Sequence, residues 1–148
     1  MITADGVVQD FAELQGNMFI YSNSSISVMS RTSSSVAPLS VRPVTSAYGA
    51  LTTDAVLEFD GRHLVVGTQD IYIFGGHPGS IQSIADAKVR DAFYQRLNTM
   101  SVHSLFLLRY PQNDEIWLCY PTLNATLGRA DEALVWNIEV MFGLREIY

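Results

Sequence analysis

Hydrophobic positions along the chain fall into short runs separated by turn-forming residues, most clearly in Val56–Phe74. Within this stretch, Asp60-Gly61 can supply the positive-φ positions of a tight type I′ hairpin turn, because glycine has no Cβ to clash there. Gly67–Asp70 provides a second, four-residue turn. The runs between these turns are rich in β-branched and aromatic residues, which suits a largely buried pleated sheet. The pattern predicts a three-strand antiparallel meander.

The same pattern occurs 45 residues earlier, where Gly16–Met29 aligns with Gly61–Phe74 without a gap. A third, longer version places a turn and strand in Asn113–Tyr120 and a partner strand in Ala133–Ile138, across a long loop. Repeated apolar hairpins at such a spacing are typical of four-stranded propeller blades. We therefore expect a mainly β fold made of antiparallel β-meander repeats that resemble blades.

Three blades do not close a propeller, which typically needs at least four. Three arrangements remain open. The chain is a piece of a larger propeller, or other chains complete a ring, or the sheets close as a sandwich. In each case, residues 1–148 would form a single β-rich domain or a propeller fragment.

One segment, residues 84–98, instead predicts an α-helix. It carries an apolar stripe with four-residue spacing, formed by Ala85, Val89, Phe93 and Leu97. Ser83 stands where an N-terminal cap is expected, with Asp86 in the first turn. Because the segment interrupts the repeat, we expect an insertion at about residues 80–99, packed on the side or end of a sheet.

Three flanking segments are less regular. Met1–Leu14 is mildly apolar without clean periodicity, so it is either an edge strand or an irregular start. Val41–Leu51 contains Pro43, which has no N–H to donate, so a strand here must be an edge or a strand start. Ser101–Tyr110 returns to a strand pattern.

Charge is scarce in this chain. Charged residues make up 16% of it and hydrophobic residues 48%, whereas soluble domains carry about 25% charged residues. We expect a partner to cover much of the surface, and predict that the working form is not a stable monomer. The net charge of −6 offers no electrostatic footprint for gripping phosphates. No apolar run approaches the ~18 residues of a membrane-spanning helix, and Met1–Gln15 lacks the basic and apolar regions of a signal peptide.

The residues that could act as metal ligands or catalytic groups are scattered along the sequence. His63, His77 and His103 show no metal-ligand spacing. Cys119 is the only cysteine and has no histidine nearby in sequence, so we expect a small buried hydrophobe. We find no catalytic constellation and predict neither an enzyme nor a cofactor or metal site.

The residues most worth following are large side chains suited to packing or oligomer contacts: Phe93, Leu97, Tyr110, Trp117, Tyr120 and Trp136. We expect Trp117 and Trp136 on adjacent antiparallel strands, buried between neighbouring sheets, with each indole N–H meeting a carbonyl. Strand alternation places Glu115, Trp117 and Cys119 on one face.

Four segments carry a resemblance to a known family. In order, they are GRHLVVGTQDIYIF (Gly61–Phe74), SIQSIADAKVRDAFYQRLN (Ser80–Asn98), NDEIWLCYPT (Asn113–Thr122) and EALVWN (Glu132–Asn137). Together they resemble the propeller segment of bacteriophage tail nozzle proteins, also called tail tubular protein B. The chain is far shorter than members of that family.

The resemblance implies a viral structural protein of the phage tail, made in the host cytoplasm and carried in the virion. It implies a homo-oligomer that contacts other tail proteins and forms part of a ring around the DNA channel for DNA ejection. Double-stranded DNA would pass through without specific binding. The alternative is a receptor- or carbohydrate-binding β-repeat module of a virion, in which Trp117, Tyr120 or Trp136 would contact the ligand.

Overall fold

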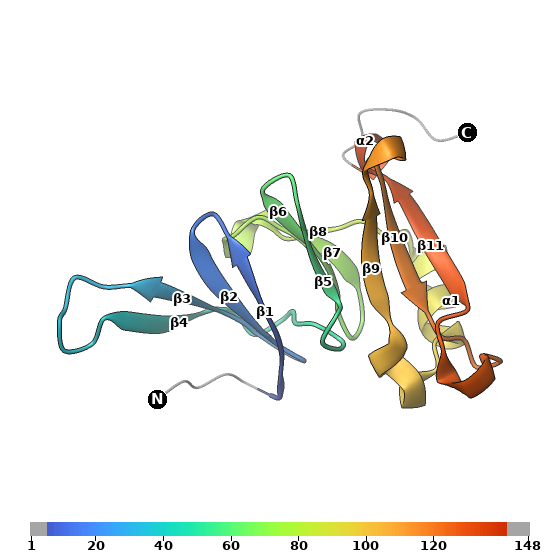
Figure 1. Ribbon diagram of the computed structural model, residues 1–148, viewed down its shortest axis with the longest axis horizontal. Coiled ribbons are helices and arrows are strands. Elements are labelled where there is room, and N and C mark those ends of the chain that lie inside the picture. The colour runs from blue at the N-terminus through green and yellow to red at the C-terminus, as the bar shows by residue number, and fades with distance from the viewer. Residues whose placement is uncertain (1–5, 142–148) are drawn as a thin grey trace. The chain divides into compact units, whose positions relative to one another are not determined.

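The computed structural model describes residues 6–141. The chain divides into two compact units, residues 1–85 and residues 86–148, and each is described by itself. The described part is mainly β, with eleven strands in three antiparallel sheets (Figure 1). These sheets are open, and no closed propeller is formed within the described residues.

The first unit contains two four-stranded meanders. The strands of the first sheet, in spatial order, are β1 (Val8–Leu14), β2 (Asn17–Ser22), β3 (Ile26–Arg31) and β4 (Leu39–Thr45). Those of the second are β5 (Val56–Phe59), β6 (Arg62–Val66), β7 (Ile71–Phe74) and β8 (Gln82–Ser83), with a short 3-10 helix, η1 (Pro78–Ser80), before β8. The predicted meander over Val56–Phe74 is confirmed.

The repeat seen in the sequence has a structural counterpart in the turns. Gln15 and Gly16 have φ values of 53° and 84°, and Asp60 and Gly61, 45 residues later, have 48° and 77°. Both central residues of each turn are therefore left-handed, as a type I′ hairpin requires. The second predicted turn also forms, since the Gly67 amide donates to the Asp70 carbonyl at 2.8 Å.

The irregular flanks become edges of the first sheet. Val8–Leu14 forms β1, so this part of the predicted segment Met1–Leu14 is an edge strand, and residues 1–5 lie outside the described residues. Pro43 lies in β4, at the opposite edge, where a missing N–H is tolerated.

The second unit is built around a three-stranded sheet of order β11-β10-β9. Its elements are α1 (Ala87–Arg96), η2 (Thr99–Ser104), β9 (Phe106–Tyr110), η3 (Pro111–Asn113), β10 (Glu115–Tyr120), η4 (Thr126–Gly128), β11 (Glu132–Asn137) and α2 (Ile138–Met141). The predicted helix is present but shorter, and the predicted strand over Ser101–Tyr110 is right only for its second half.

The predicted N-terminal cap was wrong. Asp86 is the N-cap of α1, and its carboxylate accepts the Val89 amide at 2.9 Å. Ser83 instead lies in β8 and donates its hydroxyl to Asp70 at 3.0 Å. Pairing of β8 with β7 holds Ser83 in the sheet of the first unit, so the helix can start only after it.

Candidate interaction surface

Strand alternation gives the sheet of the second unit two different faces. On β10, the side chains of Ile116, Leu118 and Tyr120 are buried. Those of Glu115, Trp117 and Cys119 are half-buried. The alternation was predicted correctly, but within the second unit no other sheet covers the second face. Cys119 is accordingly half-buried, not buried as expected.

We call this second side of the sheet the outer face. Directly paired residues of antiparallel strands share a face, and Trp117 is paired with Leu108 on β9 and Val135 on β11. The outer face therefore consists of Phe106, Leu108, Tyr110, Glu115, Trp117, Cys119, Ala133, Val135 and Asn137. Its only charged side chain is Glu115.

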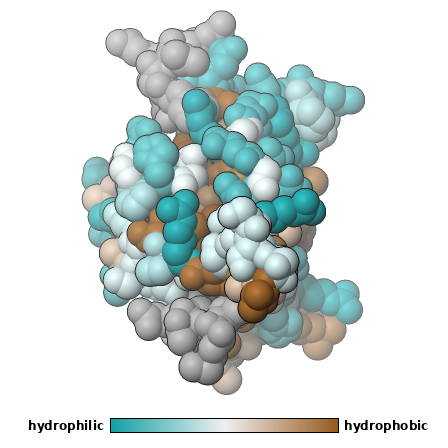
Figure 2. Space-filling model, turned by 90° about the vertical axis from the view of Figure 1, so that its left-hand side faces the viewer, coloured by the Kyte–Doolittle hydropathy of each residue, from teal (hydrophilic) through white to brown (hydrophobic). Residues whose placement is uncertain are grey.

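Several large apolar side chains of the outer face are exposed to solvent. The exposed fractions are 41% for Phe106, 48% for Leu108, 39% for Tyr110 and 44% for Val135. A contiguous apolar area of this kind marks interaction sites on soluble proteins. By contrast, Figure 2 shows hydrophobic side chains interrupted by hydrophilic ones on the side of β3 and β4.

The predicted packing residues lie on two different sides of this sheet. Phe93, Leu97 and Tyr120 are buried within the second unit, where the ring of Phe93 meets that of Tyr120 edge-on at 4.7 Å. Trp136 is half-buried and shares the face of Ile116, its direct partner. Tyr110 and Trp117 belong to the outer face.

The two tryptophans lie on adjacent antiparallel strands as predicted, but the prediction that both are buried with a carbonyl partner was wrong. They lie on the adjacent antiparallel strands β10 and β11, each half-buried. The indole N–H of Trp117 points to a carboxylate oxygen of Glu115 at 3.4 Å, not to a carbonyl. Sequence reasoning missed Phe106, Leu108 and Val135, although the alternation of Phe106, Leu108 and Tyr110 in FLLRY was a usable signal.

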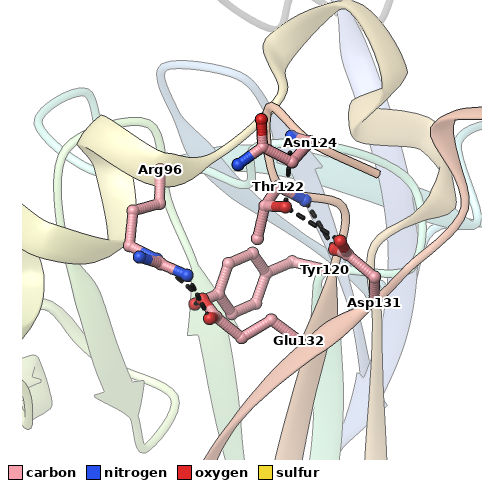
Figure 3. A network of polar contacts seen from close by, with 6 residues as sticks. All are labelled: Arg96, Tyr120, Thr122, Asn124, Asp131 and Glu132. Atoms are coloured by element: carbon pink, nitrogen blue, oxygen red, sulfur yellow. Dashed lines mark hydrogen bonds and ion pairs between the residues drawn. The ribbon is translucent and has the colours of Figure 1, made fainter. Parts of the chain in front are cut away.

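Behind the opposite face, a polar network ties α1 to the sheet (Figure 3). The guanidinium of Arg96 binds both carboxylate oxygens of Glu132, its Nε at 2.9 Å from Oε2. The hydroxyl of Tyr120 donates to the same Oε2. Hydrogen bonding to Arg96 lowers the pKa of Glu132, and burial raises the pKa of Tyr120 to about 12. Arg96 and Glu132 therefore stay charged at neutral pH.

The long loop between β10 and β11 is held by a second cluster in the same view. Asp131 accepts the Thr122 amide at 2.8 Å and the Thr122 hydroxyl at 2.9 Å. The Asn124 amide in turn donates to the Thr122 hydroxyl oxygen at 3.3 Å (Figure 3). The pKa of Asp131 is lowered, chiefly by the bond from the Thr122 amide. Carboxylates bonded in this way act as structural anchors, and the network contains no activated nucleophile.

In the first unit, a buried histidine joins the two sheets. The Nε2 atom of His63, on β6, lies 2.8 Å from the carbonyl oxygen of Glu13 on β1. Its Nδ1 lies 2.6 Å from the hydroxyl of Tyr21 on β2. A carbonyl can only accept, so neutral His63 carries its proton on Nε2 and accepts the Tyr21 hydroxyl on Nδ1. Burial lowers the pKa of His63 and raises that of Tyr21.

Two hollows of the described structure are lined by few ionisable side chains. One of about 380 Å³ is lined by Ala12, Glu13, Leu14, Gln15 and Glu58. Another, of about 340 Å³, is lined by Val89, Ala92, Phe93, Arg96, Tyr120, Glu132, Ala133 and Leu134. Over residues 6–141, no three His, Cys, Asp or Glu side chains converge as a metal site, and none of the helices there is long and apolar enough to span a membrane.

No protein-family model matches the chain, and no curated protein matches it.

Proposed function

We propose that this chain is a structural component of a bacteriophage tail, in the nozzle or tail tube assembly. In this role, copies of the chain form part of a ring around the DNA channel and contact other tail proteins during genome delivery. The proposal rests on the sequence resemblance of Gly61–Asn137 and needs no catalysis, cofactor or metal. The virion is the location that goes with it.

The structural observation that best supports an assembly role is the outer face of the second unit. A sheet with four large apolar side chains about 40–50% exposed gains stability when another surface covers it. The blade-like meanders of the first unit are compatible with a propeller segment, and other chains or further segments would complete a closed ring. The acidic net charge of −6 suits a conduit that must release DNA, because phosphate binding needs basic side chains.

Electron microscopy of the purified protein at high concentration tests this proposal. We expect closed rings with an axial channel. Particles without a channel, or a species that stays at 16.4 kDa by light scattering at all concentrations, would contradict it.

The second candidate is a receptor- or carbohydrate-binding module of a virion. It is favoured by Trp117 and Tyr110, which share the outer face and remain partly exposed, because aromatic rings at a surface can stack on sugars. Tryptophan emission that shifts on addition of glycans, with no ring formation, would favour this module over the tail component.

A further inference from the structure

The edges of the three sheets differ in how they are protected against pairing with another chain. Exposed edge strands invite such pairing unless charge, proline, a bulge or short length prevents it. Five of the six edges in the described residues have such protection. β1 has a bulge near Asp10, β4 contains Pro43 and Arg42, β5 has four residues including Glu58, and β8 has two residues. β9 has five residues and carries Arg109 inside the strand, 3.7 Å from Asp114.

Strand β11 is the exception. It is six residues long and has no proline, bulge or lysine, and its only charge is Glu132 at its first position. Arg96 already neutralises that carboxylate. The remaining stretch, Ala133–Asn137, is uncharged. The two sheets of the first unit have a fourth strand in their meanders, whereas none pairs with β11 on its far side in the described structure.

The hydrogen-bond register shows which backbone groups face that far side. The Ile138 amide donates to the Asp114 carbonyl at 2.8 Å, which makes this a hydrogen-bonded pair. Hydrogen-bonded pairs alternate along an antiparallel ladder, so Trp136 and Leu134 bond to their partners on β10. The N–H and C=O groups of Ala133 and Val135 consequently point away from β10, toward the edge.

We propose that β11 pairs antiparallel with β11 of a second copy of this chain, about a two-fold axis at Val135. Centred there, the outward backbone groups of Val135 bond to those of Val135 in the second copy, and Ala133 meets Asn137. Leu134 faces Trp136, so apolar side chains meet on that side. The two β11 strands extend the sheet to six strands and make the outer faces continuous.

Charge explains why a second copy is the occupant. Like charges directly opposite destabilise a strand pair, so in a chain with a net charge of −6 self-pairing is least opposed where the strand carries no charge. In this register no charged residue faces its own copy, because Ala133–Asn137 carries none and Glu132 lies outside the paired stretch. An isologous contact needs this self-complementarity.

The size of the contact sets its strength. Five paired residues span about 17 Å of strand, so the contact buries less than the ~800 Å² per partner of a standard stable interface. The pair is therefore concentration-dependent. The inference goes beyond the tail assignment, since the two-fold pair forms whether or not copies also close into a ring.

Two matched lysine substitutions test the pairing. Val135 and Val36 are both exposed valines, 44% and 92% exposed, but only Val135 lies on the proposed edge, and Val36 is outside the outer face. By sedimentation equilibrium, we expect the average mass of the wild type and of Val36→Lys to rise with concentration to at least twice 16.4 kDa. The average mass of Val135→Lys should be about half that of the wild type at concentrations where the wild-type pair is saturated.

Three results would overturn the proposal: a wild type that stays monomeric, a Val135→Lys variant that associates like the wild type, and equal loss of association in both variants. The last would indicate that an added positive charge at either position prevents association. Circular dichroism and thermal melting establish that both variants are folded.

Cross-linking supplies a measurement that does not depend on destabilising the contact. Directly opposed residues of a hydrogen-bonded pair have Cα atoms about 5.5 Å apart, within the range that a disulfide spans. In a Cys119→Ser background, we expect Val135→Cys to form a reducible covalent dimer on mild oxidation. Leu108→Cys in the same background is the control, and equal or faster dimer formation by this control would count against the two-fold pair.

Discussion

At the scale of single residues, the burial of His63 has the clearest consequence for stability. Its two ring nitrogens are used by a carbonyl on β1 and a hydroxyl on β2, so it links the two sheets of the first unit. Burial is the largest influence on its pKa and lowers it, although the carboxylates of Glu58 and Asp10 act in the opposite direction. The folded protein therefore favours the neutral ring.

The consequence for stability follows from linkage. The unfolded chain takes up a proton on His63 below about pH 6.5, whereas the folded chain resists it. The stabilising contribution of the neutral ring is full above that pH and is lost as pH falls below it toward the lowered folded pKa. We expect the free energy of unfolding, measured with urea, to fall from pH 7.5 to 5.

Substitution isolates this effect. His63→Phe leaves the hydroxyl of Tyr21 and the carbonyl of Glu13 without their partner, which costs about 1–3 kcal/mol at pH 7.5. The variant should also lose stability less steeply than the wild type as pH falls. His103→Asn, at an exposed position, is the control and should keep the wild-type slope. Parallel slopes for His63→Phe and the wild type would show that another group dominates.

At the scale of elements, helix α1 shows how local and tertiary effects divide. Its apolar stripe was visible in the sequence, and Phe93 is buried against Tyr120 as that stripe requires. Its ends were not visible in the same way. Pairing of β8 with β7 keeps Ser83 out of the helix start. At the other end, Leu97 adopts an extended conformation and bridges to Thr122.

The N-terminal end of α1 can be tested directly. Asp86→Ala removes the acceptor of the Val89 amide, and loss of such a cap costs about 1 kcal/mol. We expect Asp86→Ala to lower the free energy of unfolding by this amount and to speed hydrogen exchange in the first turn of α1. Ser83→Ala should leave exchange in that turn unchanged, and the reverse ranking would restore Ser83 as the cap.

The buried face of α1 allows a larger effect. Phe93 is 1% exposed, so Phe93→Ala should cost about 3–5 kcal/mol in urea unfolding through lost burial and the cavity left behind. Met100→Ala is the control, because Met100 is 90% exposed and substitutions there should stay within about 0.5 kcal/mol. A cost for Phe93→Ala well below 1 kcal/mol would mean that the α1 stripe is not packed in solution.

At the scale of the whole molecule, sparse charge and an exposed apolar face favour assembly. Trp117 provides a built-in reporter, because it lies on the outer face between Leu108 and Val135. With Trp136→Phe, it is the only tryptophan of the chain. In dilute solution we expect red-shifted emission that acrylamide quenches readily.

Assembly that covers the outer face should move this emission to the blue and protect it from acrylamide. Light scattering on the same samples supplies the state of association. Emission that stays red-shifted in assembled particles would show that the outer face is not the surface used. Trp117→Phe, which leaves Trp136 alone, is the matched control and should respond less.

The sequence by itself determined those features that depend on a few neighbouring residues. The two positive φ angles of the hairpin turn at Asp60 and Gly61 follow from local backbone sterics. The same turn forms at Gln15 and Gly16, which also have positive φ angles. Alternation along β10 likewise follows from the two-residue period of a strand. For these reasons the mainly β fold and the repeated hairpin could be predicted, and the four-residue apolar spacing of Ala85–Leu97 predicted the helix in the same local way.

Only the tertiary structure decided which apolar side chains are enclosed. Phe93 and Tyr110 are both aromatic residues within periodic apolar segments of the sequence. Phe93 is nevertheless buried under Tyr120, whereas Tyr110 faces solvent. The same holds for His63, whose tautomer is set by Glu13 and Tyr21, both more than forty residues away. Burial and hydrogen-bond partners depend on contacts between segments distant in the chain, and local patterns do not encode which segments meet.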